Sequence, residues 1–203
     1  LAICVYGYFA LTNDLFATHR TTYAIMERFA VLGLVGLALT LCIIAGEIDL
    51  SIGSNAALAA VITVRFTDSL GAPNAMLIAL AVSTSIGIIQ GYFIAYLRVR
   101  AIVLTVGTLM LLRGVALFAA EEKTVMLTDF RVPDFISTKM FVYFSPASLL
   151  VIAMFIVVGL FMSFTRYGRE IYAIGGARKE ALAAGIDLKR PMIIVVAISG
   201  VCA

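Results

Sequence analysis

The sequence predicts an all-α membrane protein, a polytopic bundle of transmembrane helices. Of its 203 residues, 63% are hydrophobic and 13% are charged, and the mean hydropathy is +1.08, whereas a soluble domain is roughly half apolar and about a quarter charged. The apolar residues gather in segments of about 20, the length that crosses a bilayer. The segments must be helical because backbone groups in lipid have no water to bond. This composition excludes ordinary soluble domains, disordered chains and nucleic-acid binders with a basic surface.

We expect a single transmembrane domain over residues 1–203, truncated at both ends. The terminal apolar segments, residues 1–11 and 191–203, are too short to cross a membrane alone. A signal peptide is the alternative for the first, but that segment lacks a basic flank and a small-residue cleavage site. Pro191 suits the first turn of the last helix. The complete spans are expected at residues 23–45, 50–66, 73–97, 101–120 and 145–164.

Loop charge predicts the orientation of the bundle. The turn at 98–100 has two arginines and no acid, and residues 166–190 hold six basic residues against three acids. The positive-inside rule therefore assigns both connections to the cytoplasm. Residues 121–139 carry four acids and three bases and are expected outside. Counting spans backward then places 47–49 on the cytoplasmic side and Asp68 outside.

A polar break separates the spans at 23–45 and 50–66. It has the sequence Gly46-Glu47-Ile48-Asp49-Leu50-Ser51-Ile52-Gly53-Ser54-Asn55. Short polar breaks at membrane depth are tolerated where they line a cavity or are buried in protein, and discontinuous helices line the pathways of transporters. The alternative is an ordinary tight cytoplasmic turn with a capping residue, since Asp49 or Ser51 can cap the next helix. The candidates for a pathway or gate are Glu47, Asp49, Ser51, Gly53, Ser54 and Asn55.

Arg113 lies inside the span at 101–120, on the order of 10 Å from its outer end. A charge at that depth is costly unless it is paired or reaches water. Arg113 is therefore a further pathway candidate, facing an aqueous route or pairing with Glu47 or Asp49, and the alternative is that it snorkels outward. Other small and polar residues in the spans are expected to serve close helix packing. They are Ser83, Thr84, Ser85, Gly87, Gly91, Thr105, Gly107, Thr108 and Gly114.

The basic connection at 166–190 predicts a short surface helix. Good helix formers from Ala177 to Ala184 lie between Gly176 and Gly185, which act as breakers. A helix of about two turns is unstable alone in water, so we expect a partner or the bundle to hold it. The alternative is a basic juxtamembrane loop attracted to anionic lipid.

No catalytic, metal or cofactor motif stands out. The sequence has one histidine, three scattered cysteines and no P-loop, Gly-x-Ser-x-Gly or His-Glu-x-x-His pattern. We therefore expect no enzyme activity, no metal and no cofactor.

Residues 46–54 resemble the Gly-Gly-Ile-Asp-Leu-Ser-Val-Gly-Ser signature of permease subunits from bacterial ATP-binding-cassette importers of the ribose, xylose and arabinose type. Three further blocks, at 95–99, 105–114 and 168–186, fit the same family in the same order. The resemblance covers about residues 23 to 203. This chain departs from the signature at Glu47, which replaces the second glycine, and Ala177 stands where the family often has Asn.

The resemblance implies an importer permease fold, similar to that of the vitamin B12 importer, in a multi-pass protein of the bacterial inner membrane. Residues 166–190 would be the cytoplasmic coupling loop that docks on a separate ATPase subunit, which would hydrolyse the ATP. The implied partners are that ATPase, a periplasmic sugar-binding protein, a second permease subunit, identical or different, and the lipid bilayer. The implied coupling residues are Gly168, Arg169, Gly175, Gly176, Arg178, Glu180, Ala181 and Gly185.

The expected function is ATP-driven import of a monosaccharide-like solute. Relatives with this signature also import rhamnose, autoinducer-2 or nucleosides, so the solute stays open. The alternative is an ion-coupled secondary transporter with Glu47 or Asp49 as the coupling carboxylate. The coupling-type loop favours the importer, because a secondary carrier has no need of an ATPase docking helix.

Overall fold

The computed structural model describes residues 2–13, 16, 18–121 and 144–203. The outer loop expected at 121–139 lies outside these ranges apart from Glu121. Every regular element within them is a helix, which confirms the predicted all-α class. The helices are α1 (Ala2–Thr12), α2 (His19–Ile44), α3 (Ile52–Leu70), α4 (Ala72–Tyr96), α5 (Ala101–Ala119), α7 (Pro146–Phe164), α8 (Arg166–Gly176), α9 (Arg178–Ala183) and α10 (Lys189–Cys202).

Four of the described helices are long and apolar enough to cross a membrane, namely α2 from Arg20 onward, α4, α5 and α7. Helix α3 has 19 residues, as many as α5, but is not among them. Polar residues near its start (Ser54 and Asn55) and near its end (Arg65 and Asp68) lower its mean hydropathy. Helices α1 and α10 are shorter, with 11 and 14 residues.

Hydroxyl side chains fix the starts of two long helices. Thr18 Oγ1 accepts a hydrogen bond from the Thr21 backbone N–H at 3.4 Å, so α2 begins at His19 rather than at residue 23. At the start of α7, Ser145 and Ser148 form a reciprocal capping box, with backbone-to-hydroxyl distances of 2.9 and 3.2 Å. Both caps satisfy N–H groups that the first helical turn leaves without a partner.

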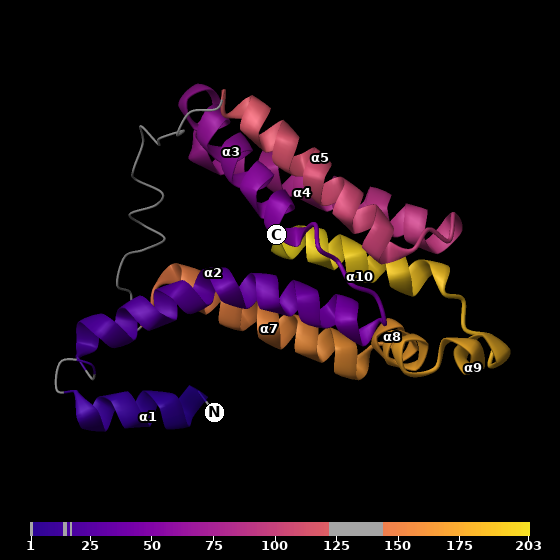
Figure 1. The fold of residues 1–203 in the computed structure, drawn as a ribbon, viewed down its shortest axis with the longest axis horizontal. Helices are drawn as coiled ribbons and strands as arrows, with labels where there is room; N and C mark the ends of the chain where they lie inside the picture. The colour runs from indigo at the N-terminus through magenta and orange to yellow at the C-terminus, as the bar shows by residue number, and fades with distance from the viewer. Residues whose placement is uncertain (1, 14–15, 17, 122–143) are drawn as a thin grey trace.

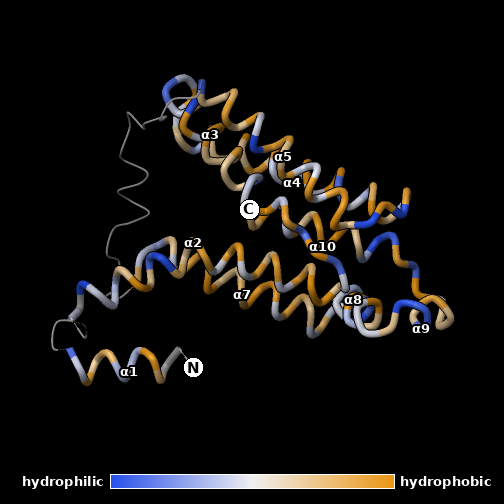
Figure 2. The backbone as a smooth tube through the Cα atoms, in the orientation of Figure 1, coloured by the Kyte–Doolittle hydropathy of each residue, from blue (hydrophilic) through white to orange (hydrophobic). Residues whose placement is uncertain are grey.

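The helices form two groups on opposite sides of α10 (Figure 1). Helices α3, α4 and α5 pack together on one side, and α2 pairs with α7 on the other, while α10 contacts both α4 and α2. The short helices α8 and α9 lie at one end of the molecule, beyond the end of α7 (Figure 1). The long helices are hydrophobic over most of their length, and hydrophilic stretches gather near their ends (Figure 2), as expected for a bilayer-embedded bundle.

The contact between α4 and α10 depends on small residues. A Cβ atom at Gly87 would lie 2.5 Å from the Val196 carbonyl oxygen, and one at Gly200 would lie 2.7 Å from the Ser83 carbonyl oxygen. Ser83 Oγ also donates a hydrogen bond to the Gly200 carbonyl at 2.6 Å. A Cβ atom at Gly91 would lie 2.9 Å from the Cα atom of Ile193. The packing role predicted for Ser83, Gly87 and Gly91 is therefore confirmed, and small residues let these backbones approach closely.

For Gly107 and Gly114 on α5, the described residues provide no such packing partner. No atom of the described chain lies within 4 Å of a Cβ placed at either position. Thr108 donates to the carbonyl of Leu104 in its own helix. Thr105 does pack, because it is buried and its hydroxyl lies 3.4 Å from the Ile48 carbonyl. Spacing within a helix identifies small residues but does not tell which face meets another helix.

The main hydrophobic core joins α2, α7 and α10 to the short surface helices. Ile171 and Ile174 of α8 and Ala181 of α9 are 1%, 3% and 4% exposed and belong to one cluster with Leu41 and Met192. Fully burying an isoleucine side chain stabilises by about 1.5–3 kcal/mol. This contact with the bundle stabilises helices that would not persist alone in water.

The α4–α10 contact generates a stability prediction. Gly87→Ala should destabilise the protein, because overpacking costs about 1–3 kcal/mol and the obstructing atoms belong to backbone. Gly107→Ala is the matched control, since it adds the same methyl group in open space and gains helix propensity. Thermal unfolding in detergent should show a clear loss of Tm for Gly87→Ala alone. Equal Tm values for the two variants would contradict this packing role.

Candidate functional site

The polar break after α2 starts with a specific backbone turn. The Glu47 N–H donates to the Cys42 carbonyl at 2.9 Å, and the Gly46 N–H donates to the Ile43 carbonyl at 3.0 Å. This pair of bonds is the Schellman motif that ends many helices. Gly46 has a φ of +78°, a conformation that glycine adopts without strain. The chain therefore leaves α2 in a defined direction and reaches α3 without regular secondary structure over residues 47–51.

A buried hydrogen-bond network surrounds the Asp49 carboxylate. Asp49 is 5% exposed, and its Oδ1 accepts from the Ser51 backbone N–H at 2.9 Å and from the Ser51 hydroxyl at 2.7 Å. Its Oδ2 accepts from the Ser199 hydroxyl at 3.1 Å. Gln90 Nε2 donates to the Ser51 hydroxyl at 2.9 Å. The carboxylate thus joins the break to α10 directly and to α4 through Ser51. Hydrogen bonds to a charged acceptor are stronger than those between neutral groups.

Asn55 continues this polar strip along α3. Its Nδ2 donates to the Ser83 carbonyl of α4 at 3.3 Å, while its Oδ1 is buried without a hydrogen-bond partner in the described part of the chain. Ser54 is also buried, but Gly53 is exposed with no atom within 4 Å of a Cβ position. Of the predicted pathway residues at the start of α3 and just before it, Ser51, Ser54 and Asn55 are therefore buried in protein, and Gly53 is not.

Arg113 stands apart from this network. It is exposed on α5, and it forms no hydrogen bond or ion pair with any residue that the structure describes. The expected pairing of Arg113 with Glu47 or Asp49 is wrong, because Glu47 pairs with Arg178 and Asp49 bonds to Ser51 and Ser199.

The predicted surface helix is α9, Arg178–Ala183, between Gly176 and Gly185. It ends in a second Schellman motif, with the Ile186 N–H bonded to the Ala181 carbonyl at 3.0 Å and Gly185 at a φ of +82°. Ala181 faces inward and is 4% exposed, whereas Glu180 on the same helix is exposed. The outer face of α9 is thus free to contact another molecule.

Sequence reasoning missed α8, which precedes α9. Thr165 Oγ1 caps it by accepting from the Gly168 N–H at 3.1 Å, and Arg166 pairs with Glu170 at 2.7 Å. This carboxylate raises the pKa of the Arg166 guanidinium. The signal that could have revealed α8 is the helical spacing of Ile171 and Ile174, both buried.

Glycines seat α8 against the bundle. A Cβ at Gly168 would overlap the Met162 carbonyl, and a Cβ at Gly175 would overlap the Ile44 carbonyl at the end of α2. Gly176 has no such neighbour. Arg169 Nη1 lies 3.4 Å from the Phe164 carbonyl, close to the start of α8. Two of the four α8 residues on the predicted coupling surface, Gly168 and Gly175, therefore make close structural contacts.

One ion pair joins a predicted pathway residue to a predicted coupling residue. Arg178 Nη1 of α9 donates to Glu47 Oε1 of the polar break at 2.7 Å. The Glu47 side chain is 16% exposed and that of Arg178 is 47% exposed. Gly46 also lies against Gly175, whose Cα is 3.4 Å from a Cβ placed on Gly46. The helix pair α8–α9 therefore contacts the break directly, although 131 residues separate the two charged groups.

Comparison with known proteins identifies a family whose model matches most of this chain. The family model described as "Branched-chain amino acid transport system / permease component" matches residues 21–203. The chain is 29% identical to the D-allose transport system permease protein AlsC of Escherichia coli, over 100% of this chain and 63% of that protein. It is 31% identical to the L-arabinose transport system permease protein AraH of Escherichia coli, over 91% of this chain and 56% of that protein.

A third relative is the autoinducer 2 import system permease protein LsrC of Photorhabdus luminescens, 26% identical over 99% of this chain and 61% of that protein. The chain thus spans about 60% of the length of these curated relatives. No solved structure matches significantly.

The Asp49 network generates a second stability prediction. Asp49→Ala should lower the free energy of unfolding by about 3 kcal/mol or more, because buried donors on Ser51 and Ser199 lose a charged acceptor. Asp49→Asn keeps one acceptor oxygen and should cost less. Urea or thermal unfolding in detergent measures both. Gly53→Ala, in the exposed part of the same segment, is the control, and an Asp49→Ala variant as stable as this control would refute the role of the network.

Proposed function

Because the chain belongs to the family of permease components of branched-chain amino acid transport systems, we propose that it is the membrane subunit of an ATP-driven importer for a monosaccharide-like solute. The relatives support the solute class, since by their names they serve transport of D-allose and L-arabinose and import of autoinducer 2. ATP would be hydrolysed by a separate subunit. The protein would reside in the bacterial inner membrane and work beside a second permease subunit, identical or different.

The observation that carries this proposal is the contact between α9 and the polar break. The exposed outer face of α9 would dock on the ATPase subunit, while its inner side is tied to the break by the Arg178–Glu47 ion pair at 2.7 Å. Movement of α9 on ATP binding would therefore pull on Glu47. Two residues further along, Asp49 is bonded to α10 and through Ser51 to α4, so the displacement would reach both of these helices.

The remaining candidate residues fit this arrangement. Glu47 and Arg178 would form the mechanical link. The rigid inner gate would consist of Asp49, Ser51, Ser54 and Asn55. Gly168 and Gly175 would hold the coupling segment against the bundle. Arg113, exposed on α5, would face the route between two permease subunits. At the opposite end of the molecule, connections such as that around Gly71 would receive a periplasmic sugar-binding protein.

An ion-coupled secondary transporter is the second candidate. It would need a carboxylate that gains and loses a cation or proton during transport. Both carboxylates of the break already have partners, because Glu47 pairs with Arg178 and Asp49 accepts three hydrogen bonds. By their names the relatives are permease proteins of transport and import systems, and no name among them refers to ion coupling.

The first functional prediction concerns the energy source. Uptake of a sugar panel by vesicles carrying the full-length protein should require the ATPase subunit and ATP, and should persist when proton and sodium gradients are collapsed. Charge reversal at Lys179 and Glu180, on the outer face of α9, should abolish co-purification of the ATPase without changing Tm. Uptake that follows an ion gradient without the ATPase would overturn the importer proposal.

The second functional prediction tests the mechanical link. Glu47→Arg should lower ATP-coupled uptake about tenfold or more, because it places two cations together, and Arg178→Glu in the same chain should restore much of it. The matched control is the Arg166–Glu170 pair of α8, which has the same 2.7 Å distance but lies within one helix. Neutralising Glu170 should leave uptake within about twofold. A charge swap that rescues nothing would refute the link while leaving the importer assignment intact.

A further inference from the structure

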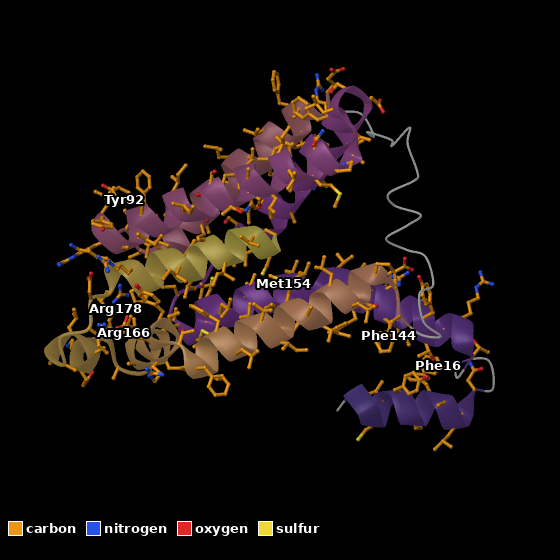
Figure 3. The ribbon with its side chains drawn as sticks, turned by 180° about the vertical axis from the view of Figure 1, so that it is seen from behind. Phe16, Tyr92, Phe144, Met154, Arg166 and Arg178 are labelled. Carbon is orange, nitrogen blue, oxygen red and sulfur yellow. The ribbon has the colours of Figure 1, made fainter. Side chains whose placement is uncertain are left out.

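A basic cavity opens at the end of the molecule that carries α8 and α9. It has a volume of about 840 Å³ and is lined by the break at 46–48, the end of α4, the turn into α5 and the connection from α9 to α10. Four cationic side chains line it, from Arg98, Arg100, Arg178 and Lys189, against two acids, Glu47 and Asp187. Figure 3 shows Tyr92 and Arg178 at this same end, on either side of the start of α10.

Two of the four cations have no partner within the described residues. Arg178 is neutralised by Glu47 at 2.7 Å, and Lys189 lies over the Tyr96 ring with its Nζ 4.9 Å from the centroid. Arg98 and Arg100 are exposed and form no hydrogen bond or ion pair with any described residue. Arginine presents several donors in a planar fork that matches a phosphate group. The cavity therefore carries uncompensated charge suited to a phosphate.

The other wall of the cavity is apolar and faces outward. Ile102 and Val103 of α5 line it and are 51% and 66% exposed. Tyr92 and Tyr96 stack at 4.8 Å in the last turns of α4, as aromatic residues do at a membrane interface. A soluble anion would contact only the arginines, whereas a phospholipid offers a phosphate together with an acyl chain that can lie along α5.

We propose that this basic cavity binds an anionic phospholipid of the cytoplasmic leaflet, with its phosphate on Arg98 and Arg100 and the start of an acyl chain on Ile102 and Val103. Basic pockets between transmembrane helices on the cytoplasmic side favour anionic headgroups. The loop charges that assign this end to the cytoplasm support the leaflet. This assignment is independent of the transported solute.

The test uses the purified protein in detergent and measures retained lipid by native mass spectrometry. Phosphatidylglycerol should be retained over phosphatidylcholine of the same acyl chains. Arg98→Asn with Arg100→Gln should reduce that retention about 25-fold, at roughly fivefold for each cation near the surface. Asparagine suits position 98 because Arg98 has a φ of +53°, which asparagine tolerates.

Arg166→Gln with Arg190→Gln is the matched control, since it removes the same charge at this end from residues that do not line the cavity. This control should keep phosphatidylglycerol retention within about twofold. Equal retention of both lipids, an equal loss in the control variant, or displacement by equimolar glycerol phosphate would each overturn the proposal. The proposal would also be overturned if the Arg98 and Arg100 variant lost ATPase association but retained lipid unchanged. These arginines would then contact the ATPase subunit rather than a phospholipid.

Discussion

The rest of the structure depends on the burial of the Asp49 carboxylate. A charge at 5% exposure is stable only if donors replace its water, and the chain supplies three of them, two from Ser51 and one from Ser199. These donors fix the start of α3 and the position of α10. Because α10 also packs on α4 through backbone contacts at Gly87 and Gly200, one carboxylate organises three helices. Any rearrangement of this region must move these helices together or leave the carboxylate without partners.

The neighbouring acid, Glu47, has a different physical role. Its ion pair with Arg178 lies near the surface, with side chains that are 16% and 47% exposed, so breaking it costs less free energy than breaking the buried bonds of Asp49. The break therefore combines a rigid point at Asp49 with an exchangeable one at Glu47, two residues apart. A segment that must keep its conformation and also respond to a docking partner needs one rigid contact and one that can be exchanged.

Local features could be predicted from the sequence, whereas contacts between residues far apart in the chain could not. Hydropathy located the long helices and the breakers at Gly176 and Gly185 located α9, because both signals are local. Helix α8 was not predicted because its short apolar face consists of two isoleucines within a charged segment. The Glu47–Arg178 pair spans 131 residues, and only the fold brings its partners together. Gly107 and Gly114 have no packing partner in the described part of the chain, and the sequence of a helix does not reveal which of its faces the neighbouring helices cover.

The polarity of α3 has a consequence for how the protein is made. A helix too polar to qualify as a span on its own has little tendency to leave the insertion machinery for lipid by itself. Gly71 is the single residue between α3 and α4, and Asn55 bonds to the Ser83 carbonyl across the pair. We therefore expect the ribosome to have completed α4 before α3 partitions, so that the two helices integrate as one hairpin.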